Sequence, residues 1–249
     1  MGDLKFYEDY WRDKKADVVD RDAIWKAKML LLVISKKKYK VVAEMGCGIG
    51  VVLDIVANEL GATHKIGLEI SKEALLKARQ LDPQMSCIQA DVMKSPIKDH
   101  SLDLVILSDI LEHLQNPAEF LTNTSNLTKY MAMNIPIEKS LFPKLFEKLA
   151  GLENQIESGK HKAGHLFEWT KKEVEKLLDD ANLKIIRSML IRPPDEFFKS
   201  SQEKKKSHIL GSASEFSLVN LEIISYGLSE NLHSRMFHTK YFAFVETRR

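Results

Sequence analysis

Two carboxylates and a histidine lie close together in the stretch LSDILEHLQNP, which begins at Leu107. Asp109, Glu112 and His113 are spaced i, i+3 and i+4, so on a helical turn their side chains would share one face. Carboxylate oxygens and imidazole nitrogens accept a divalent ion such as Mg²⁺ or Mn²⁺. The same spacing suits a capping box, in which Asp109 is the N-cap and the Glu112 side chain accepts a hydrogen bond from the Asp109 backbone N–H. The residues alone leave both interpretations open.

A second chemically suggestive stretch is EMGCGIG, in which Gly46, Gly48 and Gly50 occupy alternate positions after an apolar run. Glycines let the backbone come close to a ligand because no Cβ intervenes, and a helix that starts there points its positive end at the same place. Val51 stands where the dinucleotide fingerprint GxGxxG needs its third glycine, which counts against NAD. The turn suits part of a nucleotide or an amino acid. Cys47, between two of the glycines, is interpreted as a small buried apolar residue.

The elements around these residues alternate between strand and helix. The predicted strands begin with VVAEM and continue with KIGLEIS, MSCIQAD, SLDLVILSD and KYMAMNIP; the predicted helices are VVLDIVANEL, SKEALLKARQL and PAEFLTNTSNL. Ser71 is the expected N-cap of the second helix. Such alternation implies right-handed crossovers and a parallel sheet covered on both faces. The nearly continuous apolar run before Asp109 is typical of a strand buried on both faces.

We expect one domain over residues 1–249, since this length lies at the upper end of what one domain usually holds. Residues 1–38 are predicted to form a helical segment, with a helix from Asp20 to Ser35, and residues 39–137 a ligand-binding core. A helix opened by Thr170, the strand LKIIRSMLI and a closing strand HTKYFAFVET follow. The segments 138–164 and 192–237 are the expected insertions and lid.

Composition narrows the classes further. The net charge of +2 comes from 37 basic and 35 acidic residues, so no global field attracts nucleic acid. Cys47 and Cys87 make no disulfide framework, and without a signal peptide we expect a cytoplasmic location. The longest apolar stretch, MLLLVI, is far shorter than the roughly 18 to 20 residues that cross a bilayer. We therefore expect no membrane association.

The glycine-rich stretch resembles the first motif of the class I S-adenosylmethionine-dependent methyltransferases, an acidic residue followed by xGxGxG, which Glu44 and the glycines match. The resemblance runs from about Val41 to Ile137 and includes the terminal strand. It implies an α/β fold with a Rossmann-like, seven-stranded, mostly parallel sheet flanked by helices, with helical lid insertions. It also implies S-adenosylmethionine as the cofactor.

By this resemblance, Glu69 at the end of the second strand looks like the acid that binds both ribose hydroxyls, and Asp91 at the end of the third like the acid that meets the adenine amino group. The expected cofactor-binding residues are Glu44, Gly46, Cys47, Gly48, Gly50, Glu69, Ile70, Asp91, Val92 and Ser108. Acids at the carboxyl ends of three consecutive strands support this, because open α/β sheets bind ligands at that edge.

A further candidate is His165, which precedes LFEWT and the helix at Thr170. Together with DILEH it resembles two groups of metal-dependent O-methyltransferases, those that methylate the 2′-hydroxyl at the 3′ end of small RNAs and those that methylate catechols in quinone biosynthesis. That resemblance implies a Mg²⁺ or Mn²⁺ site made of Asp109, Glu112, His113 and His165, although Asp109 stands where the pattern has Glu. Many class I methyltransferases carry an EH pair here without a metal, and His113 or His165 is then the candidate general base.

Four functions remain in competition. O-methylation of a small molecule or glycan comes first, so a small-molecule substrate is the expected partner. The alternatives are 2′-O-methylation of RNA 3′ ends, N- or C-methylation of a metabolite, and a non-catalytic S-adenosylmethionine-binding regulatory or scaffold protein. The basic run QEKKKSH could touch phosphates, but such runs are usually solvated loops. The sequence determines neither the acceptor nor the oligomeric state.

Overall fold

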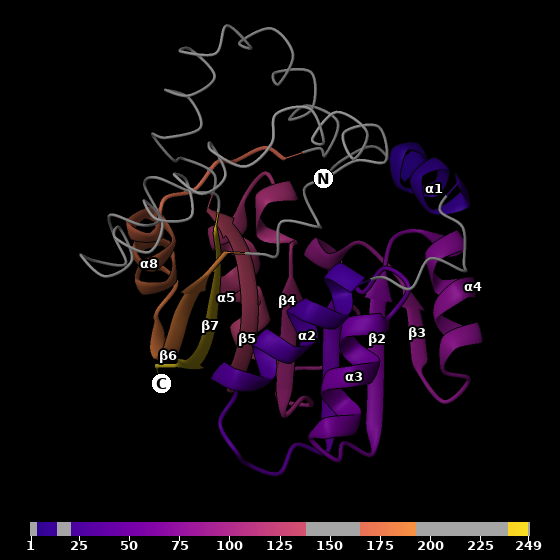
Figure 1. Cartoon of the computed structure of the whole chain (residues 1–249), viewed down its shortest axis with the longest axis horizontal. Helices are drawn as coiled ribbons and strands as arrows, with labels where there is room; N and C mark the ends of the chain where they lie inside the picture. Colours follow the sequence, from indigo (N-terminus) through magenta and orange to yellow (C-terminus); the bar gives the residue numbers. More distant parts are fainter. Residues whose placement is uncertain (1–3, 14–20, 138–164, 193–238, 249) are drawn as a thin grey trace, which may run out of the picture.

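A seven-stranded sheet runs through the centre of the protein in the computed structural model, which describes residues 4–13, 21–137, 165–192 and 239–248 (Figure 1). Its strands are β1 (Val41–Met45), β2 (His64–Glu69), β3 (Ser86–Gln89), β4 (Leu104–Ser108), β5 (Tyr130–Ile137), β6 (Leu183–Ile191) and β7 (Thr239–Thr247). They lie in the order β3-β2-β1-β4-β5-β7-β6. Strands β1 to β5 pair in parallel, and β7 is antiparallel to both of its neighbours. The predicted Rossmann-like, mostly parallel sheet is confirmed.

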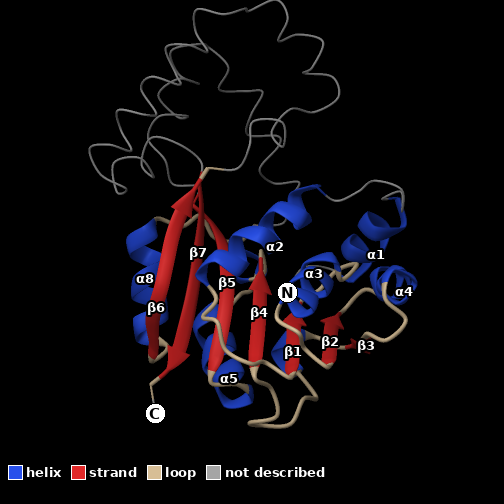
Figure 2. Cartoon of the chain, turned by 60° about the horizontal axis from the view of Figure 1, so that its bottom comes forward, coloured by secondary structure: helices blue, strands red, loops and turns tan. Residues whose placement is uncertain are grey.

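Helices cover both faces of this sheet (Figures 1 and 2). They are α1 (Leu4–Asp13), α2 (Arg21–Val33), α3 (Val51–Glu59), α4 (Lys72–Leu81), α5 (Pro117–Leu127) and α8 (Lys171–Asp180), with the short 3₁₀ helices η1 (Val92–Lys94) and η2 (Leu111–His113). Helices α2, α3 and α4 contribute to one apolar cluster, and α5 and α8 to the cluster on the opposite face. The helix expected from Asp20 to Ser35 is confirmed as α2.

Strand β4 shows why its sequence is apolar without a break. Leu104 and Ile106 belong to the cluster beneath α2 and α3, while Val105 and Leu107 belong to the cluster beneath α5 and α8. Successive side chains of a strand point to opposite faces, so a strand buried on both faces needs apolar residues at every position.

The predicted helix starts are also present. The Ser71 hydroxyl accepts a hydrogen bond of 3.2 Å from the Ala74 N–H at the start of α4. Thr170 and Glu173 form a capping box at the start of α8. Each side-chain acceptor satisfies a backbone N–H that the first helical turn leaves without a partner.

The expected insertions at 138–164 and 192–237 lie outside the described residues, apart from Arg192, so the lid stays a prediction. Among the described residues, no helix combines the length and the apolar character that crossing a bilayer demands.

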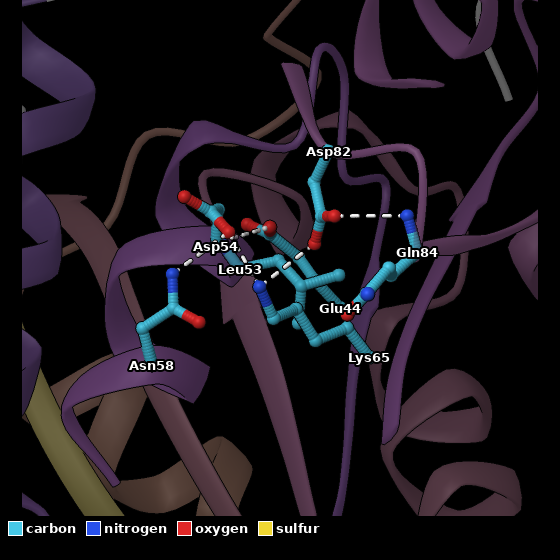
Figure 3. A network of polar contacts seen from close by, with 7 residues as sticks. All are labelled: Glu44, Leu53, Asp54, Asn58, Lys65, Asp82 and Gln84. Carbon is cyan, nitrogen blue, oxygen red and sulfur yellow. Dashed lines mark hydrogen bonds and ion pairs between the residues drawn. The ribbon is translucent and has the colours of Figure 1, made fainter. Parts of the chain in front are cut away.

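An ion-pair network fastens α3 to β2 and to the turn after α4 (Figure 3). Lys65 of β2 donates to Asp54 at 2.6 Å and to Asp82 at 2.7 Å. The Asn58 amide also donates to Asp54, and the Gln84 backbone N–H donates to Asp82. The network holds the helix that begins directly after the glycine turn.

We predict that Lys65→Met lowers the free energy of unfolding by about 1 kcal/mol at neutral pH. The hydrogen bonds from Lys65 and from the Gln84 N–H lower the pKa of Asp82. A lowered carboxyl pKa stabilises the fold above the ordinary pKa of an aspartate, and this contribution disappears as the pH falls through the folded-state value. The effect of the substitution should therefore be complete above about pH 5 and shrink as the pH falls below about 4, as measured by urea unfolding.

The matched control is Lys176→Met, which removes an exposed ion pair with Asp180 on α8. Such a pair contributes little, so its loss should be clearly smaller. Equal losses for the two variants, or a Lys65→Met effect that does not change with pH, would contradict the stabilising contribution of the network.

Candidate active site

A cavity of about 520 Å³ opens at the carboxyl ends of β1, β2 and β4. Most of the residues predicted to bind the cofactor line it: Glu44, Gly46, Cys47, Gly48, Glu69, Ile70, Val92 and Ser108. Parallel strands end at the same edge of the sheet, so residues that are far apart in the chain meet there. The topology thus brings these predicted residues together.

The glycine turn adopts a backbone that other residues rarely take. Gly46 and Gly48 have φ values of 73° and 52°, in the left-handed region. A Cβ added to Gly48 would lie 2.6 Å from Cζ2 of Trp11, and one added to Gly46 would lie 2.8 Å from Cδ1 of Ile110. Both the backbone conformation and the close neighbours therefore require glycine in this turn.

Glu69 organises the turn from the neighbouring strand. Its buried carboxylate accepts hydrogen bonds from the backbone N–H groups of Gly48 at 2.9 Å, Ile70 at 2.9 Å and Ser71 at 3.0 Å. Burial raises the pKa of Glu69, and these donors oppose that effect. The carboxylate is thus held in one orientation at the wall of the cavity.

Glu44 links the end of β1 to the helix that follows. Its carboxylate is 2% exposed and accepts a hydrogen bond of 3.0 Å from the backbone N–H of Leu53 (Figure 3). Burial raises the pKa of Glu44 well above its ordinary value. This acid lines the cavity and also fixes how α3 leaves the glycine turn.

Gly50 and Asp91 are not among the described residues that line the cavity. Gly50 is the N-cap of α3, with φ 79°. The Asp91 carboxylate accepts a hydrogen bond of 2.9 Å from the Met93 N–H at the start of η1. Its predicted contact with an adenine amino group is not tested by this geometry.

Asp109 does not form the capping box that its spacing allows, so that interpretation is wrong. It has a left-handed φ of 48°, and the N-cap of η2 is Ile110, without a side-chain cap. The Asp109 carboxylate instead forms ion pairs with Lys240, at 2.6 Å, and with Lys26, at 2.5 Å. It also accepts a hydrogen bond of 2.7 Å from the Asn134 amide. Burial would raise the pKa of Asp109, but the two lysines outweigh burial and lower it.

The other three predicted ligands do come together. Glu112, His113 and His165 offer ligand atoms within 4.8 Å of one another, a group that does not include Asp109, and the two imidazole centroids are 4.9 Å apart. Glu112 is fully buried, and neither of its carboxylate oxygens has a hydrogen-bond partner among the described residues. Burial first, and the charge of Asp109 second, raise the pKa of Glu112 to about 8. A buried carboxylate without partners is costly, so a cation or a ligand group that donates a hydrogen bond suits this position.

The segment HLFEWT brings His165 to the cluster. The Leu166 N–H donates to the Glu112 carbonyl at 2.7 Å, and Trp169 forms a β-bridge with Ile137 at the end of β5. The rings of Phe167 and Trp169 stack with centroids 5.0 Å apart, and Trp169 belongs to the core. These two aromatic residues thus anchor the segment, as their apolar character predicts.

The sequence interpretation missed two groups that line the cavity. One is aromatic and comes from α1: Phe6, Tyr7, Tyr10 and Trp11. The aromatic-rich N-terminal stretch was a usable signal for it. The other is the pair Lys26 and Lys240, from α2 and β7. Single lysines carry no sequence signal of this kind, because only the tertiary structure brings them to Asp109.

Solved structures share this architecture. A Haloferax volcanii methyltransferase, solved in complex with the Trm112 methyltransferase activator, matches with a TM-score of 0.66 at 16% identity, over 98% of each chain. Magnesium protoporphyrin IX methyltransferase from Synechocystis, with bound SAH, matches with a TM-score of 0.55 at 13% identity, over 98% of this chain and 94% of that one. At such identities the likeness concerns the fold, which is that of the Rossmann-like methyltransferases.

The chain also matches methyltransferases in sequence. Residues 43–130 match the family model described as "Methyltransferase domain". Norajmaline N-methyltransferase from Rauvolfia serpentina is 32% identical over 34% of this chain, and an S-adenosylmethionine-dependent methyltransferase of Mycobacterium tuberculosis is 28% identical over 35% of it. Each match spans 31% of the relative's length. Residues 43–130 therefore carry the pattern of a methyltransferase domain, and these matches support a class I S-adenosylmethionine-dependent methyltransferase, the class that uses S-adenosylmethionine as its cofactor.

We predict that Glu69→Ala weakens the binding of S-adenosylhomocysteine by at least about tenfold, because charge-assisted hydrogen bonds to two ribose hydroxyls would be lost. Calorimetric titration measures the affinity, and thermal unfolding checks that the turn survives. Glu59→Ala, at an exposed position of α3, serves as the control and should bind normally. Unchanged affinity in a folded Glu69→Ala variant would rule out Glu69 as the ribose ligand.

Proposed function

We propose that the protein transfers the methyl group of S-adenosylmethionine to an oxygen atom of a small molecule or glycan. The observation that carries the proposal is the shared cavity, which holds Glu69 and the glycine turn together with Glu112, His113 and His165. A donor bound by Glu69 would have its methyl group within reach of an acceptor bound at the three-residue cluster.

The chemistry asks little of such an enzyme beyond alignment. The sulfonium donor is already reactive, so the protein must bring the acceptor oxygen, the methyl carbon and the sulfur into line. His113 or His165 takes the hydroxyl proton as the O–CH₃ bond forms and the S–CH₃ bond breaks, which leaves neutral S-adenosylhomocysteine. Glu112 is placed to accept a hydrogen bond from the acceptor and to orient it.

The charges in the cavity support a neutral acceptor. Its lysines, Lys26 and Lys240, both pair with Asp109, and Lys26 also pairs with Asp22. Burial alone would lower the pKa of Lys26, but these carboxylates raise it well above its ordinary value. Both ammonium groups are therefore already paired with carboxylates, so they are not available to bind a phosphate-rich ligand.

Two alternatives keep specific support. One is methylation of RNA 3′ ends. The resemblance to the RNA enzymes predicts that His165 lies beside Glu112 and His113, and the HLFEWT segment does lie there. The other is methylation of a nitrogen atom, because the Rauvolfia relative is named an N-methyltransferase. The same imidazoles could take the proton from an amine acceptor. A purely structural S-adenosylmethionine-binding protein is disfavoured, because His113 and His165 line the donor cavity instead of lying away from it.

A divalent ion fits three of the four predicted ligands. Glu112, His113 and His165 would hold Mn²⁺ or Mg²⁺, and the unpartnered Glu112 oxygens are the reason for the fit. Asp109 is excluded from this set by its two lysines and Asn134. Such an ion would lower the pKa of an acceptor hydroxyl and fix its position.

The test is calorimetric titration of chelator-treated protein with S-adenosylhomocysteine and with Mn²⁺, repeated on His165→Ala. We expect the nucleoside to bind both proteins, and Mn²⁺ affinity to fall by at least about tenfold in the variant, as when a coordinating residue is lost. His64→Ala, at an exposed position at the start of β2, is the control. If the nucleoside binds and Mn²⁺ does not, the metal-free mechanism with a histidine base stands. If the nucleoside does not bind, the proposed function fails.

The acceptor class is tested by transfer of a labelled methyl group to catechols, sugars and RNA 3′ ends. We expect transfer to a small diol and weak, salt-insensitive binding of RNA. RNA binding that weakens steeply as salt rises, with methylation of the terminal ribose, would favour the RNA alternative instead.

A further inference from the structure

Helix α1 is fastened over the mouth of the cavity. The Glu8 carboxylate accepts hydrogen bonds from the backbone N–H groups of Lys72, at 2.8 Å, and Glu73, at 3.4 Å, at the start of α4. Lys77 of α4 donates to the Trp11 carbonyl. A carboxylate at a helix N-terminus satisfies unpaired N–H groups and the helix dipole together. The aromatic residues of α1 are thereby held at the cavity wall.

Tyr7 lines the same cavity as Glu69, Glu112 and His113. Burial first, and then the charges of Glu69 and Glu112, raise the pKa of Tyr7. Its ring makes an edge contact with His113, with centroids 6.4 Å apart. Trp11 extends this wall to the glycine turn, because its ring sits directly against Gly48.

A bound donor must span the part of the cavity between Glu69 and Glu112. This step rests on the proposed function, in which the ribose meets Glu69 and the transferable methyl group faces Glu112 and His113. The sulfonium is one carbon away from the ribose and carries that methyl group. It must therefore lie between Glu69 and the cluster, where Tyr7 covers the cavity.

We propose that α1 recognises the positive charge of the donor, with Tyr7 and Trp11 as an aromatic wall that binds the sulfonium and so favours S-adenosylmethionine over its neutral product. A cation held against an aromatic face is attracted by the ring quadrupole, most strongly where water is excluded. The two lysines that line the cavity, Lys26 and Lys240, are paired with Asp109 and Asp22, which offsets their positive charge. Tyr7 is thus a specificity-determining residue for the donor.

The test compares Tyr7→Leu with Tyr7→Phe, which keeps the ring and loses only the hydroxyl. Calorimetric titration with S-adenosylmethionine, with S-adenosylhomocysteine and with sinefungin, whose ammonium group replaces the sulfonium methyl, measures the three affinities. We expect Tyr7→Leu to weaken the two cationic ligands by about fivefold to twentyfold and the neutral product by less than about twofold. Tyr7→Phe should retain the preference of the wild-type protein.

Several results would overturn the inference. Equal weakening of charged and neutral ligands by Tyr7→Leu would make Tyr7 a structural part of the cavity wall only. Equal losses in Tyr7→Phe and Tyr7→Leu would assign the effect to the hydroxyl. Should Tyr7→Leu bind neither ligand, Trp11→Leu supplies the same comparison from the other ring, and equal weakening there also overturns the inference. If the wild-type protein binds none of the three compounds, the failure belongs to the proposed function itself.

Discussion

The carboxylate of Asp109 holds together the end of the cavity that carries Glu112, His113 and His165, which is the acceptor end in the proposed function. It joins Lys26 of α2, Asn134 of β5 and Lys240 of β7 at the end of β4. These contacts stabilise a left-handed backbone that an aspartate adopts only at a cost. That conformation turns the chain out of β4, and η2 then carries Glu112 and His113 into the cavity. Without the contacts of Asp109, the side chains of Glu112 and His113 would not be held in one orientation toward the cavity.

The donor end of the site was predictable from the sequence because its determinants are local. Glycines at alternate positions after a strand, and an acid at the end of each neighbouring strand, are enough to place Glu44, Gly48 and Glu69 at one edge of a parallel sheet. The helix starts at Ser71 and Thr170 were predictable for the same reason, since a cap is made by residues a few positions apart. The alternation of strands and helices likewise predicted the parallel part of the sheet, whereas the seven-stranded, mostly parallel form was implied by the family resemblance.

The acceptor end could be predicted only in part. The cluster of Glu112, His113 and His165 was anticipated through resemblance, but the role of Asp109 was not. Its spacing was interpreted on the assumption of a helical turn, and the left-handed backbone at Asp109 invalidates that assumption. Lys26 and Lys240 come from segments far apart in the chain, and the aromatic wall comes from a helix outside the sheet. Such contacts depend on tertiary structure, which no short pattern encodes.

The position of β7 makes one edge of the sheet depend on a single strand. Strand β6 precedes β7 in the chain, yet it joins the sheet only through β7, which pairs with β5 on its other side. Until β7 is inserted, β5 presents an open edge and β6 has no partner strand among the described elements. Pairings of such long sequence separation cost loop-closure entropy, which the contacts that β7 makes on both sides must offset. Because Lys240 lies on β7, the strand that closes the sheet between β5 and β6 also supplies one of the two lysines that pair with Asp109.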